Sequence, residues 1–503
     1  MSQNFDMINL LPISLLIIII SLLPFKEAAR TSILAKNWMH LWKSTTNVEF
    51  NEHHFSRSNE FQRNDFLKFI TLWIENHHQN SNIEKFSLTL SDPETDCEIV
   101  KRCVDFATQH GVKDLALNFS DTDWSDEEYD EPEALFELPT KVYEHKALES
   151  IKLFSCGFVA TKLIKLHSLK EVSFGWMELK NEAIKILLCN CKKIESLSIK
   201  NCWMSTNFEC GGSDLSLKTL IIDSCKFYYP RLTINAPNLS YFKYYGNVAY
   251  FKIQNSLHMN EVDINFGLEY QYPKVDEFIH KVITDFKHVK VLTVCSFILQ
   301  VLSNALGPLL VEDKLNTRHL KLMTSLHNNE YLGVLFLLNG CPMLELLTFD
   351  LGFGRFLDVS ISFLSVYLIC KAPNEYYSSE SKVEVEVEDE YSSDGDGDGD
   401  GDDDDDDDSS YVGDENQIGF IDYKNICQCL KSSLKVVEIN NFTGAKNQIL
   451  MLKFLIYNGS LIQRITINVS KEEVVNVENY HKIKECVMTI RPRASTDLEI
   501  FFC

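Results

Sequence analysis

The chain has 503 residues, 45% hydrophobic and 11% aromatic, which is enough for a sizeable core and, by length, about three domains. Of the formal net charge of −24, residues 375–415 carry −19, so the remainder is an ordinary −5 without a basic patch, and a nucleic-acid partner is not expected. The 15 cysteines are scattered and odd in number, which favours reduced thiols and a cytoplasmic or nuclear location.

The first feature along the chain is an apolar run of 16 residues, Leu10 to Phe25. The residues before it include Asp6 but no Lys or Arg, unlike the charged start of a signal peptide. A membrane-spanning helix needs about 20 apolar residues, and this run is interrupted by Pro12 and Pro24. We therefore expect no membrane partner, and a membrane-anchored repeat protein is the less favoured alternative.

The same run predicts a compact helical module. Ser14 is placed to cap a short helix over Leu15 to Leu23, and Pro24 ends it and can open the next turn. From Ala28 onward, apolar residues at three- and four-residue spacing predict one face of a second helix. A first helix that is apolar on all sides should be buried on all sides, yet about 40 residues offer too little core to cover it, so we expect a partner protein on the uncovered face. The residues of the second pattern are Thr31, Leu34, Trp38, Leu41 and Trp42.

This stretch resembles the F-box of plant proteins. The pattern is LP…LLP-x-KEAARTS-x-L-x-K-x-W-x-x-LW, which covers Leu11 to Trp42. The resemblance implies that the module docks on a Skp-type adaptor and, through it, a cullin. The two tryptophans would close the module, and plain core positions explain them equally well. The adaptor-binding residues that the resemblance implies are Leu11, Pro12, Leu15, Leu16, Ile19, Leu23, Pro24, Trp38 and Trp42.

After a helical stretch from Phe66 to Ile74, a repeat begins with the pattern apolar-x-x-apolar-x-apolar. Successive starts are 29, 36, 21, 25, 23, 22, 20, 30, 28 and 27 residues apart, the period of leucine-rich repeats. Each unit should give one short strand and a helical or irregular return, and stacked units should share one core. The starts are Ile83, Val112, Leu148, Leu169, Ile194, Leu217, Leu239, Met259, Val289, Thr317 and Leu344.

The cysteines agree with this repeat. Its consensus places Asn or Cys eight residues after the first Leu, and Cys156, Cys202 and Cys225 stand there. The alternative is a zinc site that joins Cys189 and Cys191 to Cys202 and Cys210, but a C-x-C pair lacks the usual spacing of zinc ligands, and Cys202 is already explained by the repeat. We therefore expect no metal and no cofactor.

Residues 375–415 are a low-complexity acidic segment, EVEVEVEDE followed by alternating Asp-Gly and a run of Asp. Like charges and glycine preclude a packed core, so a disordered insert is predicted over 371–416. Its alternating Asp and Gly match only the first half of an EF-hand loop and lack flanking helices.

The repeat pattern resumes after the acidic segment at Leu434 and Ile462, with a helical stretch from Ile449 to Ile456 between them. This part resembles the FBD module of plant F-box proteins. Since its pattern keeps the phase of the repeats, residues 417–503 are predicted to dock on the 344–370 end of the solenoid as its continuation and cap.

The fold class expected is α/β: a short helical F-box module over 1–50, an irregular leucine-rich-repeat solenoid over 51–370, the acidic insert, and a C-terminal FBD cap. None of the common nucleotide-binding, hydrolase or zinc-protease motifs occurs. The resemblance implies a non-catalytic substrate-recognition subunit of an SCF-type cullin-RING ubiquitin ligase, whose repeats bind an unknown target protein. The alternative is a repeat scaffold outside any ligase with a degenerate F-box, motivated by Ile13 and the isoleucine run Ile17–Ile20.

Overall fold

The computed structural model describes residues 8, 10–55, 60–77, 83–120, 136–159, 165–204, 207–227, 231–254, 258–267, 276–304, 314–352, 427–475 and 477–503. The predicted acidic insert lies outside the described residues. The first part of the chain is helical, with two α-helices followed by three 3₁₀ turns. These elements are α1 (Ile13–Ser21), α2 (Phe25–Arg30), η1 (Thr31–Ile33), η2 (Lys36–Trp38) and η3 (Leu41–Ser44).

One parallel sheet of fifteen strands follows and runs to the C-terminal end of the chain. Each strand pairs with the next in sequence order, apart from the short strands that belong to smaller sheets. Its strands are β1 (Asn47–Asn51), β2 (Lys85–Thr89), β3 (Asp114–Asn118), β5 (Ser150–Phe154), β7 (Glu171–Gly175), β8 (Ser196–Lys200), β11 (Thr219–Asp223), β14 (Tyr241–Tyr245), β16 (Glu261–Asn265), β17 (Val291–Cys295), β18 (His319–Thr324), β19 (Leu346–Leu351), β20 (Val436–Phe442), β21 (Arg464–Val469) and β22 (Glu499–Phe502).

The strand positions confirm the repeat predicted from the sequence. In each predicted unit the second and third apolar residues lie in the strand and face the core, as Leu197 and Ile199 do in β8. The first apolar residue, here Ile194, lies in the turn before the strand and is also buried. The unit is thus closed by three apolar side chains that only the neighbouring units can cover.

The turn after the strand explains the cysteines. Cys156, Cys202 and Cys225 are buried there, and each thiol donates a weak hydrogen bond to a backbone carbonyl, such as Cys202 Sγ to Lys200 O at 3.3 Å. The residue before each cysteine has a positive φ, for example 50° at Asn201. The chain therefore bends sharply after the strand and turns the small thiol inward.

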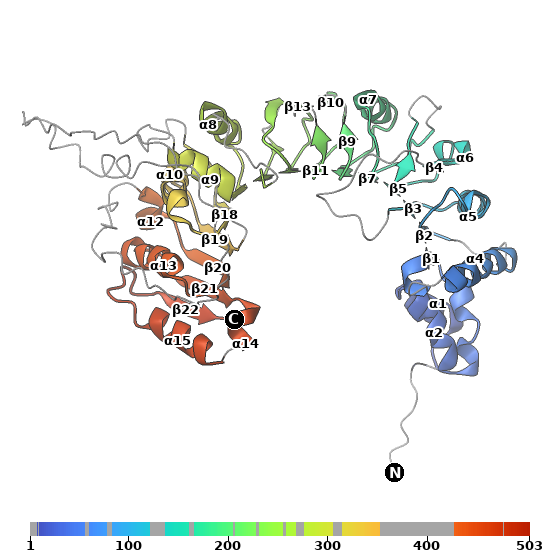
Figure 1. Cartoon of the computed structure of the whole chain (residues 1–503), viewed down its shortest axis with the longest axis horizontal. Coiled ribbons are helices and arrows are strands. Elements are labelled where there is room, and N and C mark those ends of the chain that lie inside the picture. Colours follow the sequence, from blue (N-terminus) through green and yellow to red (C-terminus); the bar gives the residue numbers. More distant parts are fainter. Residues whose placement is uncertain are drawn as a thin grey trace, which may run out of the picture. The chain divides into compact units, whose positions relative to one another are not determined.

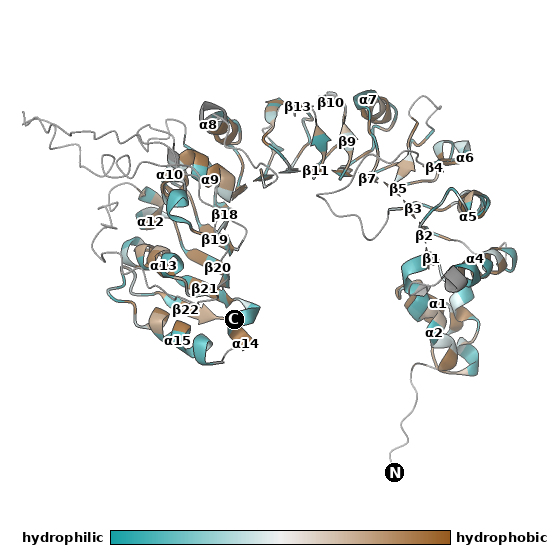
Figure 2. Cartoon of the chain, in the orientation of Figure 1, coloured by the Kyte–Doolittle hydropathy of each residue, from teal (hydrophilic) through white to brown (hydrophobic). Residues whose placement is uncertain are grey.

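The return segments depend on the length of the repeat. Units of 27–30 residues between β16 and β19 return through helices, and α9 among them carries hydrophobic colour in Figure 2. Units of 20–23 residues between β8 and β16 have no room for a helix and use short strands. The helices are α3 (Glu52–Phe55), α4 (Glu60–Glu75), α5 (Cys97–Gln109), α6 (Thr140–Tyr143), α7 (Asn181–Asn190), α8 (Asp276–Asp285), α9 (Ser296–Asn304), α10 (Tyr331–Gly340), α12 (Gln428–Ser432), α13 (Lys446–Asn458), α14 (Lys471–Val475) and α15 (Val477–Met488), with the 3₁₀ turn η5 (Asn328–Glu330).

The short strands of the return segments form three smaller parallel sheets. The three-stranded one has the order β10 (Phe208–Gly211), β13 (Arg231–Asn235) and β15 (Tyr250–Gln254). The two-stranded ones pair β4 (Phe136–Glu137) with β6 (Cys156–Gly157), and β9 (Trp203–Met204) with β12 (Lys226–Phe227). Irregular repeat spacing thus changes whether the return segments are helices or short strands, and it leaves the register of the main strands intact.

The C-terminal part continues the same sheet, as predicted. β20 pairs in parallel with β19, and Leu347 and Phe349 stand opposite Val437 and Ile439. Helix α13 includes the predicted stretch and ends at Asn458, and its Leu452 and Leu455 are fully buried. The final strand β22 lies at the edge of the sheet.

Two sequence predictions were wrong at the N-terminus, and two main strands, β1 and the final strand β22, were missed. Helix α1 begins at Ile13 with Pro12 at its N-cap, without a side-chain cap from Ser14. The predicted second helix is a short α2 followed by 3₁₀ turns, because Ala35 is extended (φ −160°, ψ 164°) and interrupts it. Strand β1 was missed because its unit opens with the polar residue Thr45.

Candidate functional site

Helix α1 divides into a buried side and an exposed side. Leu16 and Ile20, one helical turn apart, are buried. They pack with Ala28, Trp38 and Leu41 in the small core of the module. This core uses one stripe of the helix, so the rest of an all-apolar helix remains in solvent.

The module, including the exposed side of α1, exposes an unusual number of large apolar side chains. Among the described residues, nineteen large hydrophobic side chains are exposed, and eleven of them lie between positions 8 and 39. Folded monomers rarely expose clustered apolar surface of this kind unless it binds a partner. We call these residues the apolar face: Ile8, Leu10, Ile13, Leu15, Ile18, Ile19, Leu22, Leu23, Ile33, Leu34 and Met39.

The structure separates the predicted adaptor-binding residues into three groups. Leu15, Ile19 and Leu23 belong to the apolar face, and Pro12 and Pro24 are exposed beside them. Leu11 and Trp42 are half-buried against the module core.

Leu16 and Trp38 form the third group, with exposed fractions of only 2% and 5%. They lie in the module core and do not belong to the surface that the free chain offers to a partner. Contact of these two residues with the adaptor therefore stays a prediction, and in the free chain both support the module core. The sequence left open whether Trp38 is a plain core residue, and its burial in the structure favours that interpretation.

Eight residues of the apolar face were not among the predicted positions. Leu22 and Ile33 are 80% and 86% exposed, more than Leu15, Ile19 and Leu23. A helix that is apolar on every side gives no sequence signal for which side faces out. The other missed residues are Ile8, Leu10, Ile13, Ile18, Leu34 and Met39.

Aromatic side chains join the helical module to the first strand of the sheet. The ring centroid of Phe25 lies 5.6 Å from that of Phe50 in β1 and 5.8 Å from that of Trp73 in α4, both edge to face. The Asn47 side chain donates a 2.6 Å hydrogen bond to the backbone oxygen of Ser21. Edge-to-face pairs and such polar links tie the module directly to the start of the repeats.

Arg63 in α4 makes a second link in this region. Its guanidinium contacts Asp96 Oδ2 at 2.5 Å and Glu52 Oε1 at 3.4 Å, and donates to the backbone oxygen of Ser91 at 2.7 Å. Burial alone lowers the pKa of Arg63, but the hydrogen bond to Asp96 and the charge of Glu52 raise it above its ordinary value. Since Glu52 is itself buried, its charge needs this partner.

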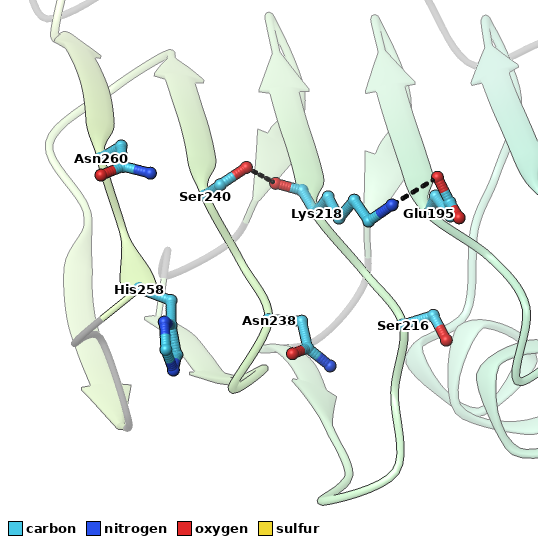
Figure 3. A pocket seen from close by; sticks show the side chains of 7 residues that line it. All are labelled: Glu195, Ser216, Lys218, Asn238, Ser240, His258 and Asn260. Atoms are coloured by element: carbon cyan, nitrogen blue, oxygen red, sulfur yellow. Dashed lines mark hydrogen bonds and ion pairs between the residues drawn. The ribbon is translucent and has the colours of Figure 1, made fainter.

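A second candidate site is a polar groove of about 520 Å³ where several strands of the main sheet begin (Figure 3). Lys218 Nζ lies 2.9 Å from Glu195 Oε2, and the Ser240 hydroxyl donates to Lys218 O at 3.0 Å. Asn238 Nδ2 donates to Leu215 O at 2.7 Å. We call this the polar groove; its lining residues are Glu195, Ser216, Lys218, Asn238, Ser240, His258 and Asn260.

The buried thiols offer little nucleophilic chemistry. Burial raises the pKa of Cys103, Cys210 and Cys341 to about 12, so these thiols stay protonated at neutral pH. Within the described ranges, no cluster of three His, Cys, Asp or Glu side chains is arranged to hold a metal ion. No helix in the described part of the chain has the length and apolar character needed to cross a bilayer.

Comparison with known proteins gives these sites a family. Models of the F-box domain, of the At1g61320/AtMIF1 LRR domain and of FBD match residues 8–49, 74–375 and 421–467. In Arabidopsis thaliana, a relative named as the F-box/LRR-repeat protein At5g54820 is 29% identical over 90% of this chain and 88% of its own length. The F-box protein At3g62230 is 28% identical over 92% of this chain and 90% of its own length.

A third relative, named as the F-box protein At3g29830, is 32% identical over 69% of this chain and 77% of its own length. The LRR model alone spans more than half of the chain, and the described strands of that region follow its repeat. The chain therefore belongs to the plant family of F-box, leucine-rich-repeat and FBD proteins.

Proposed function

We propose that this chain is the substrate-recognition subunit of an SCF-type cullin-RING ubiquitin ligase. The observation that carries the proposal is the apolar face, because eleven of the nineteen exposed large hydrophobic side chains among the described residues lie in the F-box. A Skp-type adaptor would cover that face and connect the chain to a cullin. At protein interfaces a few well-buried central residues contribute most of the free energy of association.

The proposed mechanism is proximity. The receptor holds a target protein near the ubiquitin-charged enzyme and raises the effective concentration of the target's lysines, without bond chemistry of its own. Cytoplasmic or nuclear action fits this role, since the partners must meet there. The edge-to-face contact of Phe25 with Trp73 supports it, because this contact connects the adaptor-binding module to the repeats that would hold the target.

The test is capture of the full chain by a purified plant Skp-type adaptor. Leu15→Asp together with Leu22→Asp places two charges on the apolar face without touching the buried stripe. Because truncating one interface anchor costs about 2 kcal/mol or more, we expect capture to weaken at least about tenfold.

The matched control is Leu72→Asp with Leu461→Asp, two exposed leucines outside the F-box. This variant has the same composition and charge and should be captured like the unmodified chain. If both double variants are captured equally, the apolar face does not bind the adaptor.

The alternative function is a repeat scaffold that acts outside any ligase. The exposed position of Ile13 favours it, because this residue differs from the acidic side chain common at that place in the plant F-box pattern. The same capture experiment separates the two functions. Failure of the folded, unmodified chain to bind any Skp-type adaptor would support the scaffold.

A further inference from the structure

The residues that immediately precede the main strands form a continuous row across the sheet. The backbone N–H of each donates to the carbonyl oxygen of the previous member, at distances of 2.7–3.0 Å. Neighbouring members therefore lie about one strand spacing apart, roughly 4.8 Å. We call this the pre-strand row; from β2 to β20 its members are Glu84, Lys113, Glu149, Lys170, Glu195, Lys218, Ser240, Asn260, Lys290, Arg318, Glu345 and Lys435.

The first six members of the pre-strand row alternate in charge. They form ion pairs between adjacent repeats, with N–O distances of 3.6 Å for Lys113–Glu84, 2.7 Å for Lys170–Glu149 and 2.9 Å for Lys218–Glu195. The hydrogen bond from Lys170 and the charges of Lys170 and Lys113 lower the pKa of Glu149. Each charge in this part of the row has a compensating neighbour.

The alternation stops at the polar groove. After Lys218 come the uncharged Ser240 and Asn260, and then two residues of the same sign, Lys290 and Arg318. Arg318 pairs with Glu345 at 3.0 Å, whereas the exposed Lys290 forms no ion pair with any described residue. The row thus leaves two neutral positions between two cations, and the groove lies over them (Figure 3).

The groove also offers polar groups to a ligand. Ser240 and Asn238 use their donors on backbone oxygens. Ser216, His258 and Asn260 have no side-chain hydrogen bond to any described residue, and their side chains are drawn along the groove in Figure 3. Hydroxyl, imidazole and amide groups can each donate to an anionic oxygen.

We propose that the polar groove binds an acidic segment of the target protein, with an Asp or Glu carboxylate seated over Ser240 and Asn260. This inference rests on the proposed function only in taking the bound protein to be the ligase target. A carboxylate there would lie about one to two strand spacings from Lys218 and Lys290, within the screening length of physiological salt. It would restore the alternation of the row, whereas a basic segment would meet Lys290 and Arg318.

The test measures binding of fluorescein-labelled peptides to the full chain by anisotropy at physiological ionic strength, where charges more than about 8 Å apart are screened. The probe is a short peptide of alternating Glu and Ser, compared with Gln-Ser and Lys-Ser peptides of the same length. We expect the Glu peptide to bind and the other two to bind at least about tenfold more weakly, because charge-assisted hydrogen bonds are lost.

Two variants locate the site. Lys290→Glu removes the cation next to the groove that has no ion-pair partner among the described residues, and Asn260→Asp supplies the missing carboxylate from the chain itself. Each should weaken binding of the Glu peptide about tenfold or more. The matched control for Lys290→Glu is Lys435→Glu, which changes an exposed member of the same row away from the groove by the same charge. Its effect should stay within about twofold, since distant charges are screened.

Equal binding of the Glu and Gln peptides, or equal effects of Lys290→Glu and Lys435→Glu, would overturn the proposal. Binding of a phosphoserine peptide without binding of the Glu peptide would also overturn it, because the occupant would then be a phosphorylated segment. The adaptor variant Leu15→Asp with Leu22→Asp should bind the Glu peptide normally. If instead the unmodified chain binds the Glu peptide but is not captured by any Skp-type adaptor, the ligase role is refuted and the groove proposal stands.

Discussion

The C-terminal module should be an integral end of the repeat array, and its loss should destabilise the array. Its strand β20 completes the edge of β19. Helix α13 is held in place through Asn447. Its side-chain amide donates to Leu326 O at 2.8 Å, and its backbone carbonyl accepts from the Tyr331 hydroxyl at 2.7 Å. Since Leu452 is fully buried, Leu452→Ala should lower the free energy of unfolding by about 2–5 kcal/mol.

Urea denaturation followed by circular dichroism measures this change. Leu461→Ala is the control, because this leucine belongs to the same module but is 43% exposed, and it should cost no more than about 0.5 kcal/mol. Truncation after Tyr411 should leave β19 as an open edge and cause aggregation in size-exclusion chromatography. If residues 1–411 remain soluble and monomeric with unchanged stability, the module is independent and this reasoning is wrong.

Three further predictions concern stability. Gly333→Ala should lower the free energy of unfolding by about 1–3 kcal/mol, because a Cβ there would lie 2.1 Å from Leu299 O on α9; an unchanged urea midpoint would contradict that close approach. Burial raises the pKa of Glu330, so its ionisation should lower stability as the pH rises through the folded-state pKa; Glu330→Gln should gain in melting temperature relative to the unmodified chain between pH 4 and pH 7, and a constant difference would refute this. Deleting residues 392–409 should leave the melting temperature nearly unchanged, since an Asp-Gly run forms no packed core; a large drop would show that the run packs.

Most of the fold could be predicted because one pattern repeats. Thirteen of the fifteen main strands follow from three apolar positions per unit, whatever the length of the return. The missed strand β1 shows the limit, since Thr45 stands where an apolar residue usually begins the unit. The interrupted second helix shows another, because the extended backbone at Ala35 is set by packing within the module.

The candidate sites were less predictable, for two different physical reasons. The F-box motif located the surface, but a helix apolar on every side cannot show from sequence that Leu16 faces in while Leu22 faces out. The polar groove depends on residues about 20–30 positions apart that the sheet places side by side, as Lys218, Ser240 and Asn260 are. The sequence signal for the groove is the charge alternation before the strands, which ends after Lys218. It can be recognised only once the register of the strands is known.

Because the F-box passes directly into β1, the distance of any repeat from the F-box is set by the number of strands between them. In the strand order, β14 is the eighth strand from the module, seven spacings of about 4.8 Å, or roughly 34 Å measured along the sheet. Loss or duplication of one repeat moves everything beyond it by one spacing and leaves the adaptor-binding end unchanged. In the proposed assembly, repeat number therefore adjusts the reach between the ubiquitin-charged enzyme and the target's lysines in steps smaller than a lysine side chain.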